Sequence, residues 1–158
     1  MEARAKFLGH PIHQMLIVFP LGLLATSFFF DVAFLVFGRS ELATTSWWMI
    51  LAGVIGGLAA AVFGLIDWLA IPDDTRAKAI GMWHGAGNVG VVGLFAASWF
   101  LRKPSPATPP MVTIVLSAIA VAIALVTGWL GGELVDRLGV GVSDDASLDA
   151  PSSLRRRS

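Results

Sequence analysis

Seven polar side chains in this sequence lie inside long apolar stretches or at their ends, where polar groups are costly to bury. A charged side chain at the centre of a bilayer costs about 2.5–3.5 kcal/mol on insertion scales, so each such residue needs a partner or a function. Imidazole and carboxylate groups ligate haem iron, zinc and non-haem iron, and they also relay protons. The seven residues, which include every histidine of the chain, are His10, His13, Asp31, Asp67, His84, Asn88 and Glu133.

Four apolar stretches must position these side chains. They cover about residues 15–37, 47–71, 81–101 and 111–134, and each is long enough for a bilayer span of about 20 residues. Hydrophobic residues make up 56% of the chain and charged residues 14%, against about 25% charged in soluble domains. Short connections force neighbouring helices to be antiparallel. The sequence therefore predicts an all-α integral membrane protein, an up-down-up-down four-helix transmembrane bundle in one domain, residues 1–142.

The basic residues predict how this bundle is oriented. Eight fall on the side of the two termini: Arg4, Lys6, Arg76, Lys78, Arg137, Arg155, Arg156 and Arg157. Three fall on the other side: Arg39, Arg102 and Lys103. The positive-inside rule then places both termini in the cytoplasm, with the chain in the plasma (inner) membrane. The six tryptophans lie near the ends of the stretches, as interfacial aromatic belts would.

Two further features concern the surroundings of the helices. Pairs of small residues four apart, such as Gly53 with Gly57, predict close helix–helix contacts and permit a homo-oligomer. The polar tail, residues 143–158, has few apolar residues and is predicted to be disordered. Equal numbers of basic and acidic residues give no net charge, so nothing favours nucleic acid as a partner.

Helical spacing and depth in the membrane predict that most of these polar residues lie close together. His13 and Asp31 are 18 residues apart, or five turns, and share a helix face. His84, Asn88 and Ser98 share a face of the third stretch. The antiparallel order brings most of the titratable residues to the cytoplasmic end, and Asp31 alone lies toward the opposite end. The residues expected to converge are His10, His13, Asp67, His84 and Glu133.

Each of these residues also has a plain structural explanation. His10 precedes Pro11 at a helix start, and His13 or His84 can hydrogen-bond a carbonyl or an acid. Asp67 and Glu133 can pair with nearby basic residues. A weak internal repeat favours a shared site, because the first and third stretches begin with histidine, and the second and fourth end with tryptophan and an acid.

Motifs at both ends of the chain carry a family resemblance. The opening is Gly9-His10-Pro11-Ile12-His13, then Leu16, Pro20 and Leu21, and the closing is Gly128-Trp129-Leu130-Gly131-Gly132-Glu133-Leu134-Val135, then Gly139-Val140-Gly141-Val142. Both motifs, with Asp67 before Ile71-Pro72 and His84 with Asn88 between them, resemble a bacterial family of four-span membrane proteins, domain of unknown function 2231. The resemblance covers about residues 7–142.

The resemblance implies little about activity, which is not established for the family. Some similar proteins are fused to Rieske-type or cytochrome domains, which implies electron transfer. In those fusions the position matching Glu133 is often histidine, and the glutamate here removes that ligand.

The first functional hypothesis is a redox carrier that binds haem b in the bundle near its cytoplasmic end. Helical bundles hold cofactors between facing helices, and haem iron accepts axial histidines. His13 and His84 are the expected ligands, with His10 and Asn88 beside them. Quinone or a redox partner protein would then exchange electrons with the haem. The absence of cysteine excludes iron–sulfur clusters and covalent haem attachment.

Two alternatives use the same residues differently. One is a non-haem zinc or iron site, with ligands from His10, His13, His84, Glu133 and Asp67. The other is a proton or ion relay, or an assembly module, with no cofactor. No nucleophile or phosphate-binding motif decides whether the protein is an enzyme.

Overall fold

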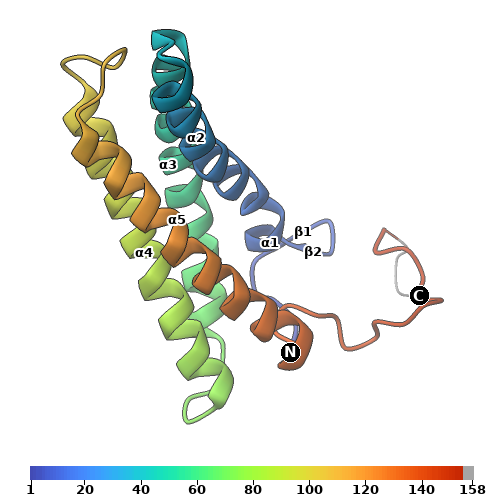
Figure 1. Cartoon of the computed structure of the whole chain (residues 1–158). Helices are drawn as coiled ribbons and strands as arrows, with labels where there is room; N and C mark the ends of the chain where they lie inside the picture. Colours follow the sequence, from blue (N-terminus) through green and yellow to red (C-terminus); the bar gives the residue numbers. More distant parts are fainter. Residues whose placement is uncertain (155–158) are drawn as a thin grey trace.

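Five α-helices, a short π-helix and one small β-hairpin are present in the part of the chain that the structure describes. The computed structural model describes residues 1–154 (Figure 1). In chain order the elements are β1 (Lys6–Phe7), β2 (His10–Pro11), α1 (Ile12–Leu16), α2 (Val18–Phe37), α3 (Ser40–Leu69), α4 (Arg76–Arg102), α5 (Met111–Gly132) and the π-helix η1 (Glu133–Arg137). The fold is all-α apart from the hairpin. Residues 143–154 form turns, and Arg155, Arg156 and Arg157 lie outside the described residues.

Local signals fix where the long helices begin and end. Gly38 ends α2 in a left-handed conformation (φ 66°), which glycine adopts at little cost, and its N–H bonds the Phe34 carbonyl. The hydroxyl of Thr75 accepts a hydrogen bond from the Lys78 N–H and so caps α4. Pro110 precedes α5, and a proline there breaks any continuous helix.

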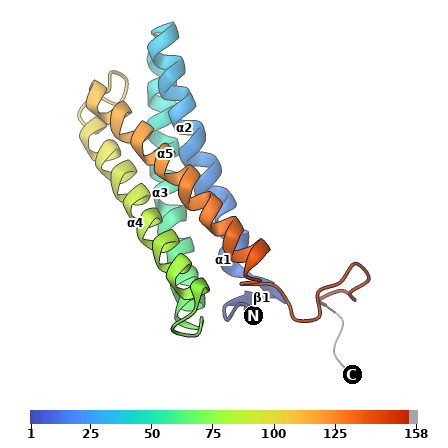
Figure 2. The ribbon, with the colours of Figure 1, turned by 60° about the horizontal axis from the view of Figure 1, so that its bottom comes forward.

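The long helices pack side by side. α2 lies along α3, α4 lies along α5, and further contacts join α3 to α4 and α2 to α5. Figure 2 shows the N-terminal segment with β1 and the α3–α4 connection (residues 70–75) at one end of the bundle, here called the proximal end. The distal end carries the α2–α3 and α4–α5 connections, residues 38–39 and 103–110. The core between the helices contains Leu24, Ile50, Val91, Phe95 and Ala120.

A break separates α1 from α2. Pro20 has no N–H to donate to the carbonyl of Leu16, so the regular helix is interrupted between the two segments. The ring of Pro20 is buried against α3, where a Cβ at Gly56 would lie 3.4 Å from its Cδ. The interruption leaves α1 packed against α3.

The β-hairpin was not expected from the sequence. Lys6 pairs with Pro11 and Phe7 with His10 in an antiparallel register. The two residues between the strands, Leu8 and Gly9, both have positive φ (50° and 87°), as a type I′ hairpin turn requires. The expected signal for such a turn is Asn-Gly, and Leu-Gly does not give it.

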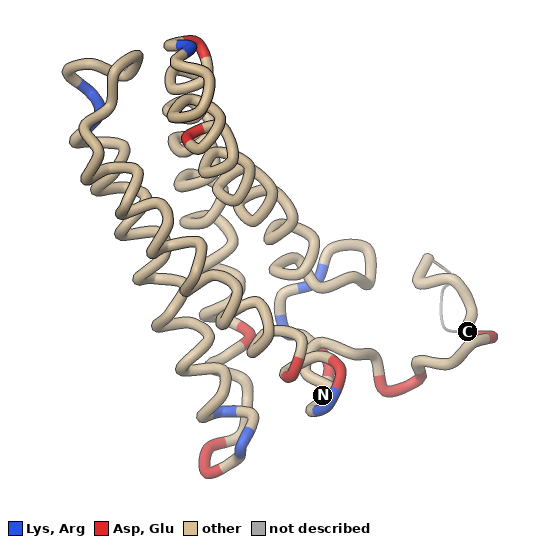
Figure 3. The backbone as a smooth tube through the Cα atoms, viewed as in Figure 1, with Lys and Arg blue, Asp and Glu red and all other residues tan. Residues whose placement is uncertain are grey.

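Three segments are long and apolar enough to cross a membrane: Ile12–Phe37, Ser40–Leu69 and Met111–Arg137. They contain the first and fourth stretches expected from the sequence and all but the last two residues of the second, which ends at Leu69 and not at Ile71. The third stretch falls inside α4, which has 27 residues but includes His84, Asn88 and charged residues at both ends. Charged residues gather toward the two ends of the helices and leave the middle nearly free of them (Figure 3).

Close packing of α2 on α3 depends on glycine, and this can be tested. A Cβ at Gly53 would lie 2.6 Å from Cδ2 of Leu24, whereas one at Gly93 would meet nothing within 4 Å. We expect Gly53→Val to lower the free energy of unfolding by about 1–3 kcal/mol, because overpacking forces the helices apart. Gly93→Val is the matched control, since both changes place valine inside a helix. Thermal unfolding in detergent measures both, and equal losses would contradict the packing explanation.

Candidate functional site

His13, in α1, is held by two residues of α3. Its Nδ1 lies 2.9 Å from the carbonyl oxygen of Ala60. A carbonyl oxygen only accepts hydrogen bonds, so Nδ1 carries the proton and Nε2 keeps a lone pair in the neutral ring. One turn further along α3, Gly64 leaves room for the ring, because a Cβ there would lie 2.8 Å from Cε1. The imidazole is therefore fixed in orientation and tautomer.

His84, in α4, is held by α5 in the same way. Its Nδ1 donates to the carbonyl oxygen of Thr127 at 2.8 Å. A Cβ at Gly131 would lie 3.1 Å from Cε1 of the ring. Asn88 adds a contact that His13 lacks: its Nδ2 lies 3.2 Å from Nε2 of His84. The hydroxyl of Thr127 orients this amide by donating to Oδ1 of Asn88 at 3.0 Å.

The two histidines lie close together at the proximal end. Their ring centroids are 6.3 Å apart and the rings are nearly perpendicular, at 86°. Each ring is anchored through Nδ1 to a backbone carbonyl, which is the arrangement that orients metal-ligating histidines and makes their Nε2 more basic. The expectation that His13 lies near His84, with Asn88 beside His84, agrees with this geometry, and their role as cofactor ligands stays a prediction.

The other expected ligands have different neighbours. His10 is exposed in β2, with Nε2 3.3 Å from the hydroxyl of Ser153. Asp67 accepts hydrogen bonds from the backbone N–H groups of Arg4 and Ala5, at 2.7 and 3.0 Å. Glu133 pairs with Arg76 at 2.6 Å. Within residues 1–154, no three histidine or acidic side chains are grouped so as to hold a metal ion.

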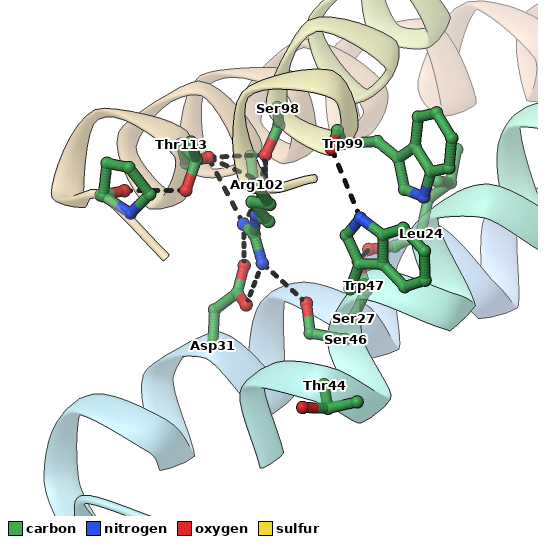
Figure 4. A network of polar contacts seen from close by, with 12 residues as sticks. Leu24, Ser27, Asp31, Thr44, Ser46, Trp47, Ser98, Trp99, Arg102 and Thr113 are labelled. Atoms are coloured by element: carbon green, nitrogen blue, oxygen red, sulfur yellow. Dashed lines mark hydrogen bonds and ion pairs between the residues drawn. The ribbon is translucent and has the colours of Figure 1, made fainter. Parts of the chain in front are cut away.

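A second polar cluster lies at the distal end and joins four helices (Figure 4). Nη1 and Nη2 of Arg102 donate to the two carboxylate oxygens of Asp31, at 2.6 and 2.7 Å. Both side chains are fully buried. The hydroxyls of Ser46, Ser98 and Ser117 complete the shell, each 3.1–3.2 Å from a guanidinium nitrogen. The cluster thereby links α2, α3, α4 and α5.

The sequence missed this cluster because Arg102 was assigned to the connection after the third stretch. It is in fact the last residue of α4. A usable signal was present, since Arg102 lies four residues after Ser98 and continues the face that carries His84, Asn88 and Ser98. The sequence suggested that Asp31 is the only one of these polar residues at its end of the bundle. In the structure it is paired there with Arg102.

Buried polar groups between long apolar helices define a class, the helical membrane proteins, in which polar groups are satisfied inside the protein. The chain belongs to the family described as predicted membrane protein (DUF2231), which matches residues 9–144. The family resemblance seen in the sequence is thus confirmed, and the membrane-embedded helices contact lipid. No curated protein and no solved structure matches this chain.

The buried ion pair should fail when one partner is removed. We expect Asp31→Leu to lower the free energy of unfolding by about 3–5 kcal/mol, because it leaves the Arg102 guanidinium buried without its counter-charge. The double variant Asp31→Leu/Arg102→Met should recover most of that loss, since both charges are then gone. Thermal unfolding in detergent compares the three proteins. A stable Asp31→Leu protein would contradict this account.

Proposed function

We propose that the protein is a redox carrier of the plasma (inner) membrane that binds haem b through His13 and His84. The single observation that carries the proposal is the pair of neighbouring imidazoles whose Nδ1 atoms are both committed to backbone carbonyls. This arrangement leaves Nε2 of each ring as the atom that can bind a metal. Haem would supply one-electron chemistry, and quinone or a redox partner protein would exchange electrons with it.

The number of available ligands favours haem over a non-haem metal. Zinc sites take three or four protein ligands. His10, Asp67 and Glu133 are occupied elsewhere, which leaves two histidines. Haem iron needs only one or two axial ligands, because the macrocycle supplies the other four.

The two rings also lie close enough together for both to hold one metal-containing group. Their centroids are 6.3 Å apart. If His84 held such a group through Nε2, the amide of Asn88, which lies 3.2 Å from that nitrogen, would sit beside it. Asn88 would then act as a positioning residue beside the ligand.

The proposal includes four membrane-spanning helices in an up-down-up-down bundle, with α4 as the third span. Supporting this, α4 is as long as the apolar helices and turns its buried polar residues toward them. With the chain termini and the α3–α4 connection in the cytoplasm, the basic residues obey the positive-inside rule. Burial of Arg102 removes one basic side chain from the opposite surface and so strengthens the bias.

The haem assignment is tested by visible absorption of the purified protein in detergent, before and after dithionite, with metal analysis of the same sample. We expect a Soret band that shifts on reduction. His13→Ala and His84→Ala should each weaken and shift this band, because each removes one of the two side chains that would hold the haem. His10→Ala is the control and should leave the spectrum unchanged, since His10 is exposed in the hairpin.

Other results would redirect or end the assignment. Unchanged spectra in both histidine variants would exclude these ligands. A colourless protein with one bound zinc or iron would favour the non-haem site. A colourless, metal-free protein that also fails to take up added haem would leave a proton relay or an assembly module.

The orientation is tested with reporters fused to the C-terminus. A reporter that is active only in the cytoplasm should be active there, and one that is active only in the periplasm should be silent. The same reporters inserted in the connection 103–110 should give the opposite result. Activity of the periplasmic reporter at the C-terminus would reverse the assigned topology.

A further inference from the structure

The two halves of the chain place matching residues at matching positions. Asp31 and Arg102, which contact each other, are 71 residues apart. The same displacement carries the other buried residues of α2 onto buried residues of α4: Pro20 onto Val91, Leu24 onto Phe95, and Ser27 onto Ser98. It also carries His13 onto His84.

A second displacement relates α3 to α5. Moving along the chain by 67 residues carries four buried residues of α3 onto buried residues of α5: Ser46 onto Thr113, Ile50 onto Ser117, Gly53 onto Ala120, and Ala60 onto Thr127. Gly64 moves onto Gly131 by the same step. The second displacement is four residues smaller, so the segment from Arg102 to Thr113 is about one helical turn shorter than the equivalent segment from Asp31 to Ser46.

Helical periodicity alone does not explain these matches. Any two amphipathic helices can be aligned so that their buried faces coincide. Here the same alignment also matches chemistry. It carries one histidine onto the other, the carbonyl acceptor of the first ring onto that of the second, and the glycine beneath the first ring onto the glycine beneath the second. The helix contacts repeat as well, because α2 packs on α3 as α4 packs on α5.

We infer that α1–α3 and α4–α5 are two copies of one helical-hairpin unit related by a pseudo-two-fold axis. Equivalent residues that touch must flank that axis. It therefore passes between Asp31 and Arg102 at the distal end and between His13 and His84 at the proximal end. A ligand bound between His13 and His84 would lie on this axis, and Nε2 of each ring would hold it. The ligand class is a single metal centre with two equivalent imidazole ligands, and this last step rests on the proposed function.

The repeat accounts for contacts that differ between the two halves of the chain as well as for those that agree. Asp31 and Arg102 occupy equivalent positions with opposite charges, because two like charges there would repel. At the proximal end, the position equivalent to Asn88 is Ile17, so only His84 has an amide beside its Nε2.

The first experiment exchanges the two charges, as in Asp31→Arg/Arg102→Asp. A pseudo-two-fold axis gives the new arginine Ser27 in place of Ser98, and Thr113 in place of Ser46. We expect each single variant to lower the thermal midpoint in detergent by roughly 10 °C, and the exchanged protein to recover more than half of that loss. An exchanged protein no more stable than the worse single variant would overturn the repeat.

A second exchange distinguishes two-fold equivalence from a merely tolerant ion pair. Ser117 bonds Arg102, and its counterpart in α3 is Ile50. Adding Ile50→Ser/Ser117→Ile should raise the midpoint of the charge-exchanged protein and lower that of the wild-type protein. This reversal of sign follows only if the two positions are equivalent. The same sign in both backgrounds would contradict the inference.

The shared ligand is tested with added haem and the variants His13→Gly and His84→Gly. Wild type should give a low-spin spectrum with two imidazole ligands, and each variant a high-spin spectrum that exogenous imidazole returns to low spin. A low-spin spectrum retained in either variant would overturn the equivalence of the ligands. If the wild type takes up no haem, the proposed function and the shared ligand both fail, whereas the charge exchange still decides the repeat.

Discussion

The contact between Asp31 and Arg102 sets the architecture of the distal half of the bundle. Neither side chain is accessible to solvent, so each charge depends on the other and on hydroxyl groups from three helices. Breaking one contact in such a shell leaves a charge without compensation, at a cost of several kcal/mol. The shell therefore fixes the rotation of each helix about its own axis, because only one register brings all its members together. The apolar contacts around it tolerate small shifts far better.

At the proximal end, neutral polar groups between the helices also need hydrogen-bond partners. A helix offers no free carbonyl in its middle, since each carbonyl already accepts from the N–H four residues ahead. His13 and His84 nevertheless bond such carbonyls, those of Ala60 and Thr127. A second acceptor lone pair makes this possible, and a glycine one turn further along leaves space for the ring. Glycine here is required by the imidazole as much as by the packing of the helices.

Much of this arrangement follows from the sequence, and the reasons for success and failure are physical. Apolar length predicted the helices, and helical spacing placed His84 and Asn88 together on an inward face. The acids were expected at the same site, but short-range partners hold them elsewhere: Glu133 meets Arg76, and Asp67 caps backbone N–H groups of the N-terminal segment. Residue types do not reveal a hydrogen bond between a side chain and the backbone of a distant segment. Arg102 was missed because a charge at the end of an apolar stretch normally marks the start of a connection.

The internal repeat was faintly visible in the sequence, but through partly wrong residues. The match of His13 with His84 is sound, whereas Asp67 and Glu133 are not equivalent, since the displacement that relates α3 to α5 carries Asp67 onto Leu134. The true counterparts are small or buried groups, such as Ala60 with Thr127, whose shared role is to present a carbonyl. Such residues are equivalent in their position and in the backbone group that they present, so their side chains can differ. Where two equivalent charged residues touch across a two-fold axis, they must carry opposite charges. Asp31 and Arg102 form such a pair.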